Sequence, residues 1–379
     1  MPRYLESLIA KDLKKKMVFV GGPRQVGKTT LALNLLGASD TNLDGEETPG
    51  YYNWDYVQHK SAILAGQLQT EQKRIVYDEI HKYPQWRNLL KGFYDHYRSK
   101  KQFLVTGSAR LDHYRRGGDS LQGRYHYYRL HPFSLGEIGT SQPLDALLKF
   151  GGFPEPLFAQ SDSVWRRWQR ERQARVIYED LVSLERVTEV SKIDLLVTLL
   201  PRRVGSPISL ANLARDLQVA HETVARWLDM LESLYVCFRL APFGFSKTQS
   251  VKKEQKLYLW DWSLCEDEGA RFENMVASAL LKYCHLLEDS EGYKMELQYL
   301  RHREGREVDF VVTRDGKIEF IVEAKLAGAE LSPQLPYFRR HVPKAPMYQV
   351  HAGVKDYESH EARVRVLPVA ALIKELKLP

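Results

Sequence analysis

The feature that most constrains the fold is a short loop sequence at residues 22–29. Gly22 and Gly27 are followed by Lys28 and Thr29 in a spacing that matches GxxxxGK(S/T) in full. The apolar run 17–20 precedes the loop, and a stretch with helical spacing follows it at 29–36. A strand, a glycine loop and a helix in this order bring backbone N–H groups and a helix N-terminus around a polyphosphate. The sequence therefore predicts a nucleotide-phosphate site.

The loop residues are expected to hold ATP together with Mg²⁺. Lys28 is expected to reach the β- and γ-phosphates, while the Thr29 hydroxyl ligates the metal ion. The glycines permit the backbone angles and the close approach to phosphate that such a loop requires. The predicted cofactor-binding residues are Gly22, Pro23, Arg24, Gln25, Val26, Gly27, Lys28, Thr29 and Thr30.

A second apolar run, 75–77, ends in the acidic pair Asp78-Glu79. Carboxylates directly after a buried strand are suited to a metal ion and to proton transfer. We expect Asp78 to hold Mg²⁺, directly or through water, together with Thr29. We expect Glu79 to polarise the attacking water. This pattern predicts that ATP is hydrolysed as well as bound.

Two further catalytic roles are expected downstream. The run 103–105 is followed by Thr106, Gly107 and Ser108, and a polar residue here can sense the γ-phosphate. Thr106 and Ser108 are both suitable, and we favour Ser108. Arg124, after Gly123, is expected to act as an arginine finger on a neighbouring subunit's nucleotide. The competing arginines are Arg110, Arg115 and Arg116.

Strands that alternate with helices in the first part of the chain predict an α/β fold with a parallel sheet. The alternation of strands and helices stops near residues 151–154, and the sequence pattern changes again at 207–260. We therefore predict an ATPase core at 1–150, a helical linker or lid at 151–205, a winged helix at 206–262 and a last α/β domain at 263–379.

Several motifs together resemble a known family. They are GGPRQVGKTT at 21–30, YYNWD at 51–55, VYDEIHKYPQW at 76–86, LVTGSAR at 104–110, LQGR at 121–124, LHPFSLGEI at 130–138, GGFPEP at 151–156 and KLYLWDWSL at 256–264. This set is similar to the AAA-type ATPases of bacteria and archaea whose C-terminal domain was long described as of unknown function. The resemblance implies an AAA+ core that acts as a homo-oligomer, with a hexamer as one arrangement.

Residues 207–260 read as helix, turn, helix and two β-like runs, which is the order of a winged helix. His221, Thr223 and Arg226 are expected on the open side of the second helix, where such modules face DNA. Lys and Arg outnumber Asp and Glu in this region, so we expect contacts mainly to phosphates. The alternative is a module for packing or for protein contacts.

A second constellation of charged residues lies near the C-terminus. Glu273 on a predicted helix, Asp309 on a strand and Glu323-Ala324-Lys325 on the next strand resemble the PD-(D/E)xK nuclease fold. Its chemistry needs carboxylates that hold Mg²⁺ against a scissile phosphate and a lysine that steers water. A three-residue turn at 315–317 would pair Asp309 with Glu323, whereas a two-residue turn would pair Asp309 with Val322. Cleavage and a degenerate fold used for binding both remain open.

The amino-acid composition indicates which partners and which cellular compartment to expect. The net charge of +7 is compatible with a polyanionic partner, and DNA is the expected one. The three cysteines show no CxxC spacing, which favours a reducing, cytoplasmic location. No apolar run is long enough to cross a membrane, so we expect no membrane partner.

We therefore expect an ATPase that remodels DNA through changes in oligomer contacts. The alternatives are a nucleotide-gated signalling or defence ATPase that binds a protein partner, and an ATP-regulated endonuclease. A metabolic kinase is disfavoured, because a winged helix and a carboxylate hairpin have no role in one.

Overall fold

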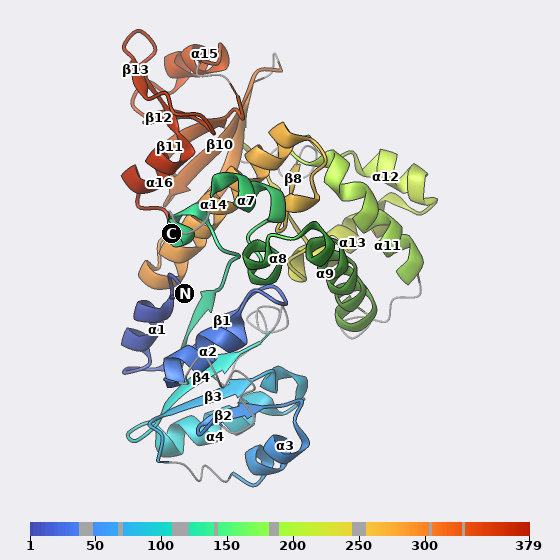
Figure 1. The fold of residues 1–379 in the computed structure, drawn as a ribbon, viewed down its shortest axis with the longest axis vertical. Helices are drawn as coiled ribbons and strands as arrows, with labels where there is room; N and C mark the ends of the chain where they lie inside the picture. The colour runs from blue at the N-terminus through green and yellow to red at the C-terminus, as the bar shows by residue number, and fades with distance from the viewer. Residues whose placement is uncertain are drawn as a thin grey trace. The chain divides into compact units, whose positions relative to one another are not determined.

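The computed structural model describes residues 1–37, 48–66, 71–107, 121–139, 143–181, 189–244, 255–302, 305–327 and 330–379 (Figure 1). The chain divides into two compact units, Met1–His131 and Pro132–Pro379. The four-part division expected from the sequence is finer than these two units and stays a prediction.

The first unit is built on a five-stranded parallel sheet with the order β2-β3-β4-β1-β5. Its strands are β1 (Met17–Gly21), β2 (Tyr51–Asn53), β3 (Arg74–Asp78), β4 (Gln102–Thr106) and β5 (Tyr125–Arg129). The apolar runs in β1, β3 and β4 are buried almost throughout, as expected for strands covered on both faces. The predicted parallel α/β architecture is confirmed for this unit.

The helix α1 (Glu6–Asp12) precedes this sheet, and its connections contain α2 (Lys28–Leu36), α3 (Val57–Leu64), the 3₁₀ helix η1 (Ile80–Lys82) and α4 (Trp86–Tyr97). α4 is amphipathic and buries Trp86, Leu90 and Phe93 in the same apolar cluster as Phe19, Tyr77 and Phe103. Parallel strands end at one common edge of a sheet. The residues that follow β1, β3 and β4 therefore lie close together, with β4 between the other two.

The second unit begins with α6 (Leu135–Ile138), α7 (Leu144–Phe150), α8 (Pro154–Ala159) and α9 (Asp162–Arg175), followed by the π-helix η3 (Val176–Leu181). The segment that carries α6 is fixed within this unit by Lys282. The buried Lys282 ammonium donates to the Ser134 hydroxyl at 2.8 Å and pairs with Glu137.

A helical module with a small sheet follows. It contains α11 (Val190–Leu199), η4 (Leu200–Arg203), α12 (Leu210–Leu217), α13 (His221–Ser233), and the antiparallel strands β6 (Cys237–Leu240) and β8 (Lys256–Leu259). The Ser209 side chain accepts from the Asn212 N–H and caps α12. Isolated bridges from Val204 and Pro207 reach β8. The predicted order of helix, turn, helix and paired strands is therefore present.

The last part contains a seven-stranded mixed sheet with the order β13-β14-β12-β11-β10-β9-β7. Its strands are β7 (Pro242–Phe243), β9 (Met295–Arg301), β10 (Glu307–Arg314), β11 (Lys317–Ala324), β12 (Met347–His351), β13 (Tyr357–Ser359) and β14 (Val364–Pro368). The associated helices are η5 (Trp262–Leu264), α14 (Glu268–Glu291), α15 (Gln334–His341) and α16 (Val369–Glu375). The helix predicted around Glu273 is α14, which the Asp267 side chain caps.

The β10–β11 hairpin corrects the expected relation between turn length and register. Arg314 pairs with Lys317, so the turn has the two residues Asp315 and Gly316, both with positive φ. That turn was expected to set Asp309 against Val322. A β-bulge leaves Glu319 as an extra residue, and Phe310 pairs with Val322 instead. Asp309 therefore lies beside Glu323 in spite of the shorter turn.

Candidate functional site

The loop that follows β1 requires glycine at both ends of its motif. Gly22 has a φ of +149°, and a Cβ there would lie 2.4 Å from the Leu130 carbonyl oxygen. Gly27 has a φ of +95° and is the N-cap of α2. Side chains at these positions would strain the backbone, so the loop conformation explains why the motif has glycine at both positions.

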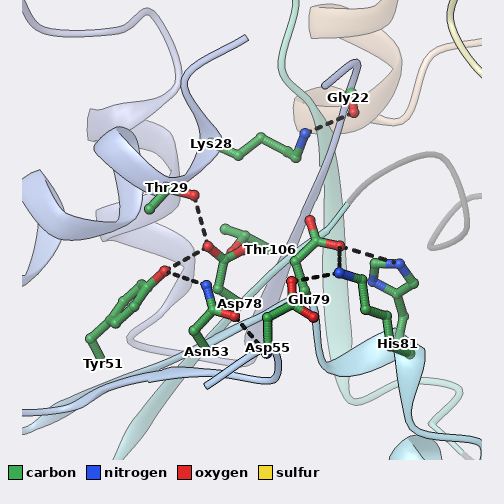
Figure 2. A network of polar contacts seen from close by, with 11 residues as sticks. Gly22, Lys28, Thr29, Tyr51, Asn53, Asp55, Asp78, Glu79, His81 and Thr106 are labelled. Carbon is green, nitrogen blue, oxygen red and sulfur yellow. Dashed lines mark hydrogen bonds and ion pairs between the residues drawn. The ribbon is translucent and has the colours of Figure 1, made fainter. Parts of the chain in front are cut away.

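Lys28 lies beneath the loop rather than in solvent. Its ammonium group donates to the Gly22 carbonyl oxygen at 3.0 Å (Figure 2) and to the Pro23 carbonyl oxygen at 2.7 Å. The side chain is buried. A buried cation at the N-terminus of α2 supplies positive charge where the helix dipole does the same, which suits a polyphosphate.

Asp78, the last residue of β3, is the centre of a hydroxyl network that includes Thr106 at the end of β4 (Figure 2). Its Oδ2 accepts from the Thr29 hydroxyl and from the Tyr51 hydroxyl, both at 2.7 Å. Its Oδ1 accepts from the Thr106 hydroxyl at 2.6 Å. The side chain is only 2% exposed. The structure thus brings Thr29 and Asp78 together as the sequence predicted.

These residues fit the Mg²⁺ that the sequence implies. Hard cations such as Mg²⁺ take oxygen ligands and keep several waters, often with one carboxylate and the phosphates of a substrate. Thr29 and Asp78 supply a hydroxyl and a carboxylate oxygen side by side at the phosphate loop. We therefore assign these two residues as those that would hold the ion.

Glu79 follows Asp78 in the left-handed region, with a φ of +56°. The pKa of Glu79 is raised to about 7, chiefly by burial; Asp78 adds to the rise, while Lys28 opposes it. Its Oε2 lies 3.6 Å from His81 Nε2 and 3.8 Å from Lys82 Nζ. A carboxyl group with a pKa near neutral pH is suited to accept a proton from water.

Sequence reasoning missed two groups that support this site. Asn53 Nδ2 donates to the Tyr51 hydroxyl at 3.2 Å and so helps to orient it toward Asp78. Arg3 donates to the loop carbonyl of Val26 at 2.8 Å. Tyr51 and Asn53 belong to the stretch at 51–55 that was noticed only as part of the family resemblance. No local pattern marks Arg3.

The other two predicted catalytic residues are Ser108 and Arg124. Ser108 lies outside the described residues, as do Arg110, Arg115 and Arg116. Of the two γ-phosphate sensors considered, Thr106 is the one seen beside Asp78.

Arg124 precedes β5, and its carbonyl accepts from the Met17 N–H at the start of β1. It therefore lies at the edge of the sheet opposite the phosphate loop. Its guanidinium pairs with Asp95 at 2.9 Å. A role on the nucleotide of another subunit stays a prediction.

In the second unit the predicted carboxylates do come together. Asp309 N–H donates weakly to Glu323 Oε2 at 3.4 Å, and Lys325 Nζ lies 2.9 Å from Glu323 Oε1. Glu273 approaches from α14. A hollow of about 550 Å³ opens over Asp309, Glu323 and Lys325. Two residues that the sequence did not indicate, Lys256 and Glu307, also belong to this cluster.

The predicted DNA-contacting residues lie in the first part of α13. His221 and Arg226 are exposed and Thr223 is half-buried. The opposite face of the helix carries the buried Val224, Trp227 and Leu228. The exposed face is therefore available for a partner.

The comparisons with known proteins agree with the first unit's geometry. Residues 14–139 match a family model described as an AAA domain, which supports an AAA-type ATPase family and nucleotide binding. Residues 141–267 and 268–372 match two models that are each described as a domain of unknown function. Among the described residues, no helix has both the length and the apolar character needed to cross a membrane.

Similar proteins are themselves uncharacterized. The chain is 29% identical over 250 residues to the uncharacterized protein Rv2008c of Mycobacterium tuberculosis, a match that covers 65% of this chain and 55% of the relative. It is 23% identical over 274 residues to the uncharacterized protein MJ1544 of Methanocaldococcus jannaschii, with 65% and 59% covered. The chain thus spans little more than half the length of these relatives.

Among solved structures, the Hef helicase domain of Pyrococcus furiosus has 12% sequence identity and a TM-score of 0.21. That match covers 62% of this chain and 67% of the helicase domain. A likeness this weak carries no argument.

Proposed function

We propose that the protein is an ATPase that uses Mg²⁺, with the active site formed by the phosphate loop and the ends of β1, β3 and β4. The observation that carries this proposal is the junction of Thr29 with Asp78 at 2.7 Å, directly beside a buried Lys28. If this loop served only the fold, it would need neither a buried lysine nor a hydroxyl and a carboxylate placed side by side.

Each residue then has a distinct task. The loop N–H groups and Lys28 bind the phosphates, while Thr29 and Asp78 hold the metal ion. Tyr51 and Thr106 fix the orientation of the Asp78 carboxylate. Bound Mg²⁺ supplies charge neutralisation at the transferred phosphate. Glu79 takes a proton from the attacking water and needs to be ionised to do so.

Phosphate release from ATP tests this proposal directly. Wild-type protein is expected to release phosphate with Mg²⁺ and to lose that activity with Glu79→Gln or Lys28→Ala. Phosphate release at the wild-type rate in both variants would contradict the proposed site.

We further propose that the partner of this ATPase is DNA. The arrangement of α11, α12, α13, β6 and β8 supports a winged helix, with His221 and Arg226 exposed on the second helix of the pair. Such helices present their exposed side to the DNA groove and its phosphates.

A basic hollow in the first unit also supports a polyanionic partner. It has a volume of about 330 Å³ and lies where β1, β3 and β4 begin. The basic residues that line it are Lys14, Lys15, Lys16, Lys73, Arg98, Lys100 and Lys101. No carboxylate is among the described residues that line this hollow. Clustered ammonium groups of this kind attract phosphates and repel one another in their absence.

Self-association is part of this proposal because of the role expected of Arg124. Because it lies across the sheet from its own phosphate loop, its expected role requires a second copy of the chain. A homo-oligomer would then couple ATP turnover to the positions of the DNA-binding parts.

The second candidate function is a signalling or defence ATPase that binds a protein partner. The exposed face of α13 is equally accessible to a protein. DNA-stimulated ATP hydrolysis that falls steeply with added salt favours the DNA proposal, whereas hydrolysis indifferent to DNA favours the protein partner.

A further inference from the structure

Lys256 is an almost completely buried charged group in the carboxylate cluster of the second unit. It is the first residue of β8, and its side chain is 1% exposed. A buried ammonium group is costly unless it is paired with charges and hydrogen-bond acceptors. The groups that surround Lys256 therefore need to compensate its positive charge.

Three carboxylates surround the Lys256 ammonium. Its Nζ lies 3.1 Å from Glu307 Oε1, 3.7 Å from Asp309 Oδ1 and 3.9 Å from Glu273 Oε1. Glu307 and Asp309 come from β10 and Glu273 from α14, so the lysine lies where these elements converge. Burial acts to lower the pKa of Lys256, but Asp309, Glu273 and Glu307 outweigh it and hold that pKa above the ordinary value.

Hydrogen-bond donors of the protein also reach the carboxylates of the cluster. The Tyr258 hydroxyl donates to Glu273 Oε1 at 2.8 Å, and the Ala324 N–H donates to Asp309 Oδ2 at 2.9 Å. On Glu323, Oε1 accepts from the Ser332 hydroxyl at 3.1 Å and pairs with Lys325. Each of these three carboxylates thus has a donor from the protein, while burial and the neighbouring Asp309 raise the pKa of Glu273 to about 8 and that of Glu323 to about 7.

The same residues do not fit the Mg²⁺ that a PD-(D/E)xK nuclease requires. In the described part of the chain, no group of three or more His, Cys, Asp or Glu side chains is arranged to hold a metal ion. The converging oxygens of Glu273, Glu307 and Asp309 instead share a lysine nitrogen. The second unit therefore has the acidic residues of a nuclease-like cluster, but these residues do not form the ligand set that the metal ion needs.

We propose that the Lys256 ammonium is a built-in cation that takes the place of the divalent metal ion in this carboxylate cluster. The cluster is then a metal-independent element of the second unit, and the hollow over Asp309, Glu323 and Lys325 does not cleave phosphodiester bonds with Mg²⁺. The inference concerns the second unit alone and does not depend on ATP hydrolysis by the first.

Binding of Mn²⁺, a spectroscopic stand-in for Mg²⁺, tests this inference by electron paramagnetic resonance on the full-length chain without nucleotide. Wild-type protein and Asp309→Asn are expected to bind equal amounts of Mn²⁺. Lys256→Met is expected to bind one additional Mn²⁺ per chain, and the further change Asp309→Asn is expected to abolish that gain. Lys294→Met, which removes an exposed lysine paired with Glu296, is the matched control and is expected to leave Mn²⁺ binding unchanged.

Removal of Lys256 alone leaves buried carboxylates without their cation and can prevent folding. The double variant Lys256→Met, Glu273→Gln keeps the formal charge of the cluster and is expected to show the same gain. Mn²⁺ binding by wild-type protein that is lost in Asp309→Asn would overturn the inference, as would a folded Lys256→Met protein with no gain. If neither lysine variant folds, the comparison of wild type with Asp309→Asn decides: equal binding supports the inference and unequal binding overturns it.

Discussion

The Thr29 hydroxyl and the Asp78 carboxylate meet at 2.7 Å, although they are 49 positions apart in the chain. The contact connects the start of α2 with the end of β3, and β4 lies between β1 and β3 in the sheet. It exists because parallel strands end at one edge, which turns two distant local patterns into one site.

Lys28→Ala is expected to weaken ATP binding roughly 10- to 100-fold. The change removes a charge-assisted contact to phosphate, and such contacts contribute about 1.5–3 kcal/mol. Titration with a fluorescent ATP analogue measures the loss. Lys11→Ala, an exposed lysine on α1, is the control, and equal affinities of the two variants would contradict the role of Lys28.

Glu79→Gln is expected to slow ATP hydrolysis roughly 10²- to 10⁴-fold while ATP remains bound, because it removes the proton acceptor. In the wild-type protein, hydrolysis is expected to rise with pH through about 7, where Glu79 loses its proton. A pH profile of kcat/KM checks this, and a profile without an inflection near that pH would argue against Glu79 as the base.

The same substitution is expected to stabilise the protein at high pH. The pKa of Glu79 is raised from 4.5 to about 7 in the fold, so the folded state binds an extra proton between these values. The stability of the wild type therefore falls as pH rises from 4.5 to 7. At pH 8 the Gln variant avoids a cost of up to about 3 kcal/mol. Urea unfolding at pH 4 and pH 8 measures the difference, which is expected only at pH 8.

Tyr51→Phe is expected to raise the Mg²⁺ concentration for half-maximal ATPase activity several-fold. The change removes one of the hydroxyls that orient Asp78 and leaves the ring in place. Tyr52→Phe, at the next position of β2, is the matched control because its hydroxyl does not contact Asp78 in the described structure. Identical Mg²⁺ dependence in both variants would remove Tyr51 from the site.

Arg124→Ala is expected to suppress ATP turnover by about 10³-fold or more if the arginine acts across a subunit interface. Mixing Arg124→Ala protein with Lys28→Ala protein is expected to restore part of the activity, since each supplies what the other lacks. Arg166→Ala, an exposed arginine on α9, is the control. No recovery in the mixture would contradict a finger that acts on a second subunit.

Arg226→Ala is expected to weaken DNA binding. It is also expected to reduce the slope of log affinity against log salt concentration by about 1, which corresponds to the loss of one phosphate contact. Arg215→Ala, an exposed arginine on the preceding helix α12, provides the comparison. Fluorescence anisotropy with duplex DNA at several salt concentrations measures both. A wild-type affinity that does not change with salt would contradict phosphate contacts.

The local parts of the site could be predicted from the sequence. The glycine spacing at 22–27 indicates a loop with positive φ angles, and the apolar runs before Gly21 and Asp78 are recognisable as strands. The helix, turn and helix of residues 210–233 follow from apolar periodicity in the same way. The strands β12, β13 and β14 were not predicted.

The contacts that join distant segments could not be predicted. Glu319 forms a β-bulge that the residue types around it do not predict. Because of that bulge, Asp309 lies beside Glu323. Lys256 belongs to a strand far in sequence from Asp309, so nothing near it suggests a role in that cluster. Tyr51 was noticed within a motif, but its hydroxyl contact with Asp78 depends on the pairing of β2 with β3.

The most direct measurement of the central claim is a crystal structure of the protein with Mg²⁺ and a non-hydrolysable ATP analogue. The account predicts the β- and γ-phosphates beside Lys28 and the N–H groups of 22–29, with the ion bound by the Thr29 hydroxyl and reached by Asp78 directly or through one water. An analogue bound elsewhere, or an ion that contacts neither Thr29 nor Asp78, would contradict it.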